Sequence, residues 1–255
     1  MNSFVLTGYI LKCAKRDKIF FSMLGALIVG FILSCFIGST AAYEQSQMQI
    51  VYSSGIFRVI FVYGFAIFNA FFITKMFQTR EIETLLAGPV PRSSLISSLM
   101  LANFVLISLL VLTVVVLLKC VFFGAIPTTH LAIWAGSLVC ETMMIIAITT
   151  LFALMLENVT SAILLTTIFY ITSRIMGFVV SSITLKMQGV SIQKVLEFLI
   201  IPVAVFFPRL DLFSQSSWLI YTDAIPNLSI IAMQSLVYIP LIFLACVIDF
   251  NKKIL

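Results

Sequence analysis

The sequence predicts an all-α integral membrane protein with six membrane-spanning helices. Apolar residues make up 62% of the 255 positions and charged residues only 10%, whereas about a quarter of the residues in soluble domains are charged. Six of the apolar runs are long enough to span a membrane, since about 20 apolar residues are enough for one helical crossing. Residues 1–255 are therefore expected to form a single transmembrane domain.

The N-terminal residues 1–18 combine apolar side chains with four basic residues, Lys12, Lys15, Arg16 and Lys18. This mixture is typical of an amphipathic helix that lies in the membrane interface. Much of the net charge of +5 collects at such membrane edges, which favours membrane lipids rather than nucleic acid as partners. The first span is expected at 19–40, and it is read as uncleaved because its apolar run is longer than that of a signal peptide.

The second and third spans are separated by a short charged interruption. A polar stretch at 43–49 is expected to lie outside the membrane, and the second span follows at 55–75. Arg58 lies near the outer end of this span, where its long side chain can extend to the lipid headgroups. The charged segment 78–94 then precedes a third span at 95–118, which contains no charged residue.

The second half of the chain predicts three more spans. The fourth and fifth are expected at 131–156 and 159–183, joined by a turn of only two residues. An outer segment at 185–223 contains the apolar run 195–207, which is too short to cross and is typical of a re-entrant or interfacial helix. The sixth span is expected at 226–248.

The distribution of basic residues predicts the orientation of the helices. Six crossings place both termini on one side of the membrane, and cytosolic segments are enriched in Lys and Arg. If both termini are cytosolic, five Lys and Arg residues lie on or near the outer side: Arg58, Lys119, Lys186, Lys194 and Arg209. Nine lie on the inner side: Lys12, Lys15, Arg16, Lys18, Lys75, Arg80, Arg92, Lys252 and Lys253. This asymmetry favours cytosolic N- and C-termini.

The segment 78–94 is the most informative part of the sequence. A short helix that starts at Arg80 can end at Gly88, because glycine suits the C-terminal cap and Pro89 cannot continue the helix. Residues three and four positions apart share one face of such a helix. That face offers a carboxylate, a hydroxyl and an apolar group to a partner, from Glu81, Thr84 and Leu85. The alternative is an ordinary solvated loop.

The run from Phe77 to Leu95 resembles the segment after the second span in permeases of ABC-2-type transporters. The matching residues are an acidic/basic pair, a Glu-Thr-Leu-Leu stretch, a small residue with proline, and a basic residue: Arg80, Glu81, Glu83, Thr84, Leu85, Leu86, Gly88, Pro89 and Arg92. The interfacial N-terminus, the six spans and the tight turn between spans four and five are similar to that family as well. The segment has fewer charges than in many members.

The resemblance implies a transmembrane subunit of an ATP-driven exporter in the cytoplasmic (inner) membrane. Residues 80–88 would form the coupling helix that seats on separate ABC ATPase subunits. The permease would pair with a second copy or a homologous permease. It would carry no cofactor itself, since ATP and Mg²⁺ would bind to the ATPase partners.

Two pairs of polar residues within the expected spans are candidates for interhelical contacts. Glu141 and Arg174 fall at similar depth in spans four and five, and an isolated charge there is costly, so they are expected to form an ion pair. The pair would either line the transport path or clamp two helices together. Asn69 and Asn103 lie near the inner ends of spans two and three, where they would hydrogen-bond between helices or line a cavity.

The sequence contains no sign of catalysis. It has one histidine, His130, and lacks the GxxxxGK[ST] loop that cradles ATP phosphates. The chain is therefore not expected to be an enzyme or to bind a metal. The alternatives to an ABC-2 permease are a haem-exporter-type permease of cytochrome c maturation, a secondary carrier, and a non-transporting membrane assembly factor.

Overall fold

The computed structural model describes residues 3–40, 44–82, 91–186, 207–221 and 228–252. The regular structure within these ranges is helical, which confirms the predicted all-α fold class. Six of the described helices are long and apolar enough to cross a membrane. They are α2 (Lys18–Ser39), α3 (Gln45–Gln78), α5 (Arg92–Val121), α6 (Thr128–Leu156), α7 (Val159–Lys186) and α9 (Leu228–Lys252).

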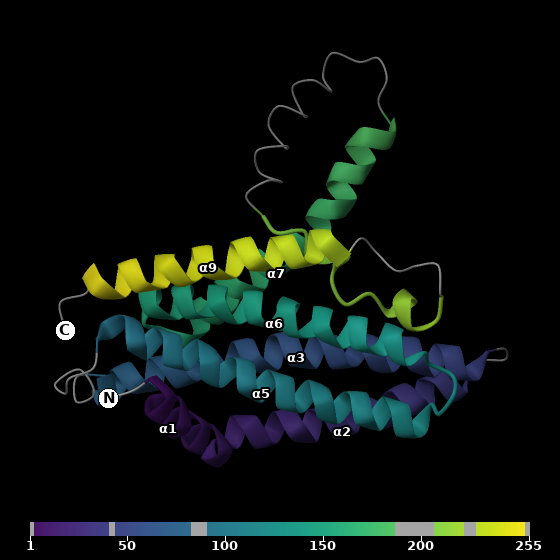
Figure 1. Cartoon of the computed structure of the whole chain (residues 1–255), viewed down its shortest axis with the longest axis horizontal. Helices are drawn as coiled ribbons and strands as arrows, with labels where there is room; N and C mark the ends of the chain where they lie inside the picture. The colour runs from purple at the N-terminus through teal and green to yellow at the C-terminus, as the bar shows by residue number, and fades with distance from the viewer. Residues whose placement is uncertain (1–2, 41–43, 83–90, 187–206, 222–227, 253–255) are drawn as a thin grey trace.

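The helices form a bundle around α6. This helix packs against α3, α5, α7 and α9. Of the residues in its most apolar 18-residue stretch, 72% are buried, which is the largest share among the six candidate spans. Both chain termini lie at one end of the bundle (Figure 1). We call this the near end. We call the opposite end, where α5 is followed by α6, the far end.

A short first helix, α1 (Ser3–Arg16), lies at the near end and packs against α5. Its buried side chains Leu6, Ile10 and Ala14 follow one another at intervals of four positions, so they form one stripe. Asp17 separates α1 from α2 and accepts a hydrogen bond from the backbone amide of Ile19, at 3.0 Å. This N-terminal cap turns the chain sharply from α1 into the first span.

The helix α3 is longer than the sequence predicted. It begins at Gln45, ten residues before the expected start of the second span, and its 34 residues extend about 51 Å. The polar start of the helix is held by α2: Gln45 Nε2 donates to the Ser39 carbonyl at 3.3 Å, and Gln49 Nε2 donates to the Cys35 carbonyl at 3.2 Å. From Gln45 onward, the polar stretch that was expected outside the membrane is therefore helical, because these glutamines stabilise a helix that extends beyond the apolar layer.

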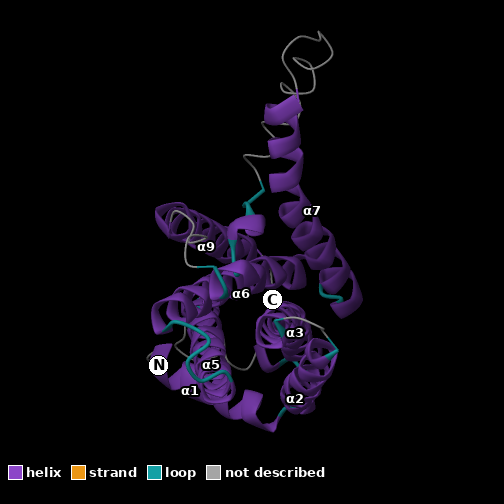
Figure 2. Cartoon of the chain, turned by 90° about the vertical axis from the view of Figure 1, so that its right-hand side faces the viewer, coloured by secondary structure: helices purple, strands orange, loops and turns teal. Residues whose placement is uncertain are grey.

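A two-residue turn joins α6 to α7. Glu157 adopts a left-handed conformation, with φ 53°, and its amide donates to the Ala153 carbonyl. The side chain of Asn158 caps the next helix by accepting from the Thr160 amide at 3.0 Å. Beyond the bundle, the last turns of α7 rise away from the other helices in both views (Figures 1 and 2).

Residues 207–221 fold back onto the far end of the bundle. They contain two short 3₁₀ helices, η1 (Leu210–Leu212) and η2 (Ser216–Leu219), which contact α3, α6 and α7. The fully buried apolar side chains in residues 207–221 include Leu210, Phe213, Trp218 and Leu219. We call residues 207–221 the cap segment. The apolar run that the sequence analysis assigned to a re-entrant helix lies outside the described residues, except for Phe207.

Candidate functional site

A buried charged cluster joins three spans within the bundle. Glu141 of α6 is 0% exposed, and its Oε1 atom lies 3.2 Å from Nη1 of Arg174 on α7. The hydroxyl of Tyr170, one turn before Arg174, donates to the same oxygen at 3.1 Å. The structure thus brings together the two residues that the sequence placed at equal depth. We call Glu141, Tyr170 and Arg174, together with Arg58 of α3, the charged cluster.

Arg174 also holds the cap segment. Its Nη1 atom donates to the carbonyl of Leu210 at 2.7 Å and lies 3.3 Å from the carbonyl of Phe213. This one nitrogen of the guanidinium therefore lies within hydrogen-bond distance of one carboxylate oxygen and two backbone carbonyls. Nη1 carries two N–H groups of the planar guanidinium, so the carboxylate oxygen and the two carbonyls share these donors. The ion pair is consequently part of the attachment of residues 207–221 to the bundle.

Arg58 makes a similar contact from α3. Its Nη1 atom donates to the Ser214 carbonyl at 3.2 Å. The amide of Ser214, which has φ 49°, donates to Ser137 Oγ of α6 at 3.0 Å. The expectation that Arg58 extends to the lipid headgroups was wrong, because the cap segment offers its guanidinium a carbonyl inside the protein.

A close approach between α7 and the cap segment adds to this attachment. The Asp211 carboxylate lies against Gly177, and a Cβ atom at that position would overlap it. Asp211 Oδ2 also accepts from Arg209 Nη2 at 3.1 Å. Only glycine leaves room for this carboxylate on the surface of the helix. The sequence analysis did not identify Gly177 as a position where close packing requires glycine.

A second polar cluster lies closer to the near end. Asn103 Nδ2 of α5 donates to Asn69 Oδ1 of α3 at 3.0 Å. Asn69 Nδ2 in turn lies 2.8 Å from Thr150 Oγ1 and 3.4 Å from the Ile146 carbonyl, both on α6. Asn69 therefore joins three helices. These contacts match the interhelical role expected for the two asparagines, and we call this group the asparagine cluster.

The expected coupling segment is described only at its two ends. Six of its predicted contact residues lie outside the described residues: Glu83, Thr84, Leu85, Leu86, Gly88 and Pro89. After α3 ends at Gln78, Arg80 adopts a left-handed conformation with φ 54°, and Glu81 and Ile82 are helical again. Ile82 is only 2% exposed, so the chain is anchored in the bundle at this residue.

Arg92, at the other end of the segment, contacts the end of the last helix. Its Nη1 atom donates to the Phe250 carbonyl at 3.1 Å and lies 3.4 Å from the Asn251 carbonyl, both in α9. Its guanidinium carbon also lies 5.9 Å from the centre of the Phe250 ring. Arg92 thus ties the start of α5 to α9 within the chain.

No metal centre occurs among the described residues, since they contain no group of three His, Cys, Asp or Glu side chains able to hold an ion. His130 Nδ1 lies 2.7 Å from the Trp218 carbonyl, which places the histidine at the contact between α6 and the cap segment. The described clusters can orient helices and fasten a segment, but they do not form a recognisable catalytic set.

Comparison of the chain with protein-family models found no match, and comparison with curated proteins found none either.

Proposed function

We propose that this multi-pass membrane protein is the transmembrane subunit of an ATP-driven transporter of the ABC-2 type. The proposal combines the resemblance of residues 77–95 with the arrangement of the bundle. It places both termini and the coupling segment in the cytosol, and the chain in a cytoplasmic membrane, with export as the direction. ATP and Mg²⁺ bind to separate ATPase subunits, and a second permease copy or a homologue completes the membrane unit.

One observation carries the proposal: the chain becomes helical again at Glu81, two residues after the turn that ends α3 begins, and Ile82 is buried in the bundle. A solvated loop would need no buried anchor at this point. A short helix fixed to the end of a long span can instead receive force from a partner and pass it to that span. This arrangement favours the coupling interpretation over the ordinary loop.

The helix α3 provides a route for that force. Arg58 lies twenty residues before Gln78, about 30 Å along the same continuous helix. A tilt or shift of α3 at the near end therefore also moves Arg58, and with it the contact between Arg58 and Ser214. The asparagine cluster lies between these two points and joins α3 to α5 and α6. We infer that ATP-driven movement of residues 80–88 changes how the cap segment sits on the bundle.

Recovery of the partner ATPase tests the proposal. The tagged full chain is purified from its native membrane in mild detergent, and the co-purified proteins are identified by mass spectrometry. We expect an ABC ATPase to be recovered with the unchanged chain and to fall about tenfold or more with Glu81→Arg. The matched control is Glu44→Arg, the same charge reversal at the other end of α3.

The outcomes separate the proposal from a structural effect. A size-exclusion profile like that of the unchanged chain shows that the variant has folded. If no ATPase is recovered with the unchanged chain under conditions that keep it folded, or if the two variants retain the ATPase equally, the proposal is wrong.

A further inference from the structure

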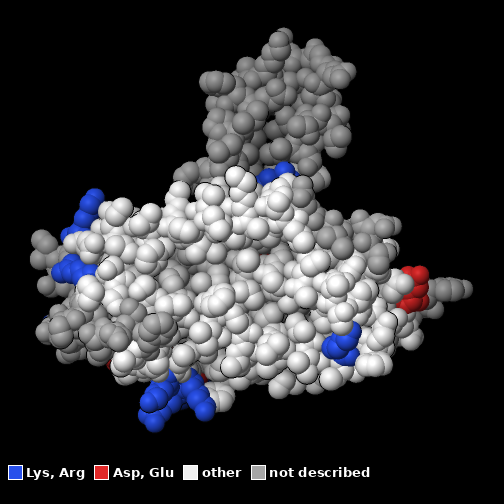
Figure 3. Space-filling view, in the orientation of Figure 1, with Lys and Arg blue, Asp and Glu red and all other residues white. Residues whose placement is uncertain are grey.

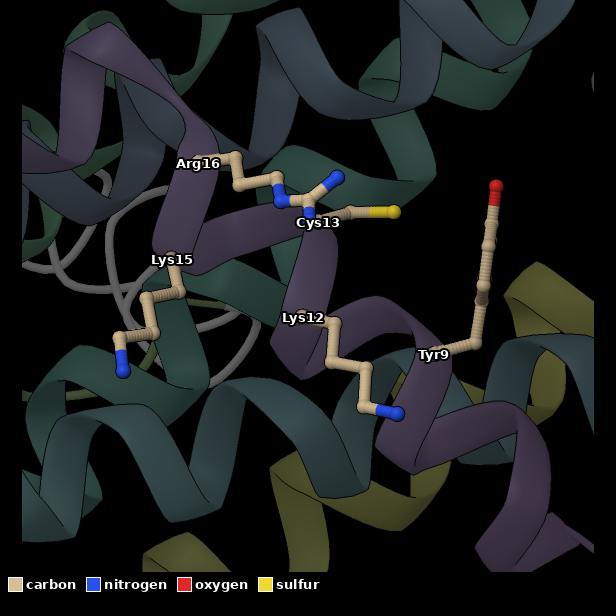
Figure 4. Close-up of a pocket in the computed structure, with 5 residues that line it drawn as sticks. All are labelled: Tyr9, Lys12, Cys13, Lys15 and Arg16. Carbon is tan, nitrogen blue, oxygen red and sulfur yellow. The ribbon is translucent and has the colours of Figure 1, made fainter.

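A groove runs along the exposed side of α1 at the near end. Its larger part is a cavity of about 630 Å³ lined by Tyr9, Lys12, Cys13, Lys15 and Arg16. Figure 4 shows Tyr9, Lys12, Cys13 and Arg16 on one side of the helix, and Lys15 on the other. This agrees with their spacing, because residues three, four and seven positions apart share a helix face. The groove therefore has two cations, a phenol and a thiol along one wall.

The groove continues to the end of α3. A second cavity of about 190 Å³ shares Tyr9, Cys13 and Arg16 with the first, and it is also lined by Phe72, Lys75 and Met76 of α3, by Asp17 and by Glu81. Phe72 and Met76 are buried, whereas Lys75 is exposed. Asp17 is engaged as the cap of α2. The second wall thus adds a third cation and an apolar floor.

The groove lies at the boundary between apolar and charged surface. The span α2 begins at Lys18, and its exposed side chains include Phe21, Ile28 and Ile32, which suit contact with lipid tails. Figure 3 shows basic side chains gathered at the corner where α1 meets α2, beside a face that is otherwise largely uncharged. Lipid phosphates occupy this level of a bilayer, immediately beyond the hydrocarbon layer.

We propose that this groove binds the headgroup of an anionic phospholipid, with its phosphate held by Lys12, Arg16 and Lys75. Charge complementarity supplies the attraction, and the apolar floor accommodates the glycerol and the first carbons of the acyl chains. A soluble phosphate ion would use the cations but gain nothing from the floor. The bound lipid lies beside Glu81, at the start of the coupling segment.

Tyr9 adds a neutral hydrogen-bond donor to the groove. A side-chain hydrogen bond with Cys13 is the main cause that raises the pKa of Tyr9, and the nearby carboxylate of Glu81 adds to the effect. The phenol therefore keeps its proton at physiological pH and can donate to a phosphate oxygen. Tyr9 and Glu81 both line the second cavity, so the lipid site and the coupling segment share a boundary.

Native mass spectrometry of the purified full chain tests the proposal. The chain is incubated with phosphatidylglycerol, with phosphatidylcholine, or with inorganic phosphate, and the bound species are counted across a concentration series. We expect retained phosphatidylglycerol and little binding of the other two probes. Each cation near a membrane surface contributes ~1 kcal/mol, so Lys12→Gln with Arg16→Gln should weaken binding about 30-fold.

A control and a single variant keep the test specific. Lys18→Gln with Lys252→Gln removes the same charge at the near end outside the groove, and it should leave affinity within about twofold. Lys12→Gln alone should weaken binding about fivefold, and its exposed side chain makes unfolding unexpected. Equal binding by the groove and control variants, or retention of phosphate with no preference for the anionic lipid, overturns the proposal. Neither outcome depends on recovery of an ATPase.

Discussion

Replacing Arg174 with glutamine should destabilise the fold more than replacing its partner Glu141 with glutamine. Both changes remove the ion pair, but they leave different groups behind. Without Arg174, the Glu141 carboxylate is still 0% exposed and keeps the Tyr170 hydroxyl as a hydrogen-bond donor, with Arg58 as the remaining nearby cation. Without the Glu141 charge, Arg174 keeps two backbone carbonyls, and its side chain is 22% exposed.

The expected magnitudes follow from these remaining contacts. Removing one partner of a buried ion pair costs about 3–5 kcal/mol because the other charge loses its direct partner while it stays buried. Arg174→Gln also weakens hydrogen bonds to the Leu210 and Phe213 carbonyls, each worth about 0.5–1.5 kcal/mol. We therefore expect a loss of about 4–6 kcal/mol for Arg174→Gln and about 1–3 kcal/mol for Glu141→Gln, where the remaining cation is partly solvated.

Reversible unfolding in mixed micelles, titrated with a denaturing detergent, measures both free energies. The charge-swapped chain, Glu141→Arg with Arg174→Glu, provides the sharpest check. A glutamate at position 174 cannot donate to the two carbonyls, so the swap should recover less than half of the loss caused by Arg174→Gln. Full recovery by the swap, or a greater loss for Glu141→Gln than for Arg174→Gln, would show that Arg174 does not hold the cap segment.

Two further predictions use matched positions within the bundle. Gly177→Ala should lower the free energy of unfolding by about 1–3 kcal/mol in the same titration, because the new methyl group meets the Asp211 carboxylate. The control Gly136→Ala should cost little, because nothing lies within 4 Å of its added Cβ atom. Equal effects of the two variants would contradict the close approach of Asp211 to Gly177. Asn69 makes three interhelical hydrogen bonds and Asn103 makes one of them, each worth about 0.6 kcal/mol. Asn69→Leu should therefore destabilise the fold by about 2 kcal/mol, and Asn103→Leu by less than about 1 kcal/mol. A larger loss for Asn103→Leu than for Asn69→Leu would contradict the central place of Asn69.

The sequence contained enough information to predict the six spans and the pairing of polar residues across them. Spans are set by long apolar runs, which do not depend on how the helices pack. Glu141 and Arg174 could be paired because a two-residue turn fixes the register between their helices. The depth of each residue in the membrane then follows from counting residues along its helix. Glu141 and Arg174 are expected to be in contact because an isolated charge inside the membrane is costly.

The attachment of the cap segment could not be predicted in this way. Arg58 and Ser214 are 156 positions apart, and no local pattern indicates which carbonyl an arginine will reach. The contact between Gly177 and Asp211 could not be predicted from the sequence either, because it depends on tertiary packing. The longer start of α3 was missed because Gln45 and Gln49 are polar, although their bonds to α2 favour helix there.

The side of the membrane that carries Glu81 tests the central claim most directly. In a chain whose five native cysteines are replaced by serine or alanine, Glu81→Cys and Gln47→Cys are probed in whole cells with a membrane-impermeant maleimide. The proposed function predicts that Gln47→Cys reacts in intact cells and that Glu81→Cys reacts only after the membrane is permeabilised. Labelling of Glu81→Cys in intact cells would contradict it, because a segment outside the cell cannot contact a cytosolic ATPase.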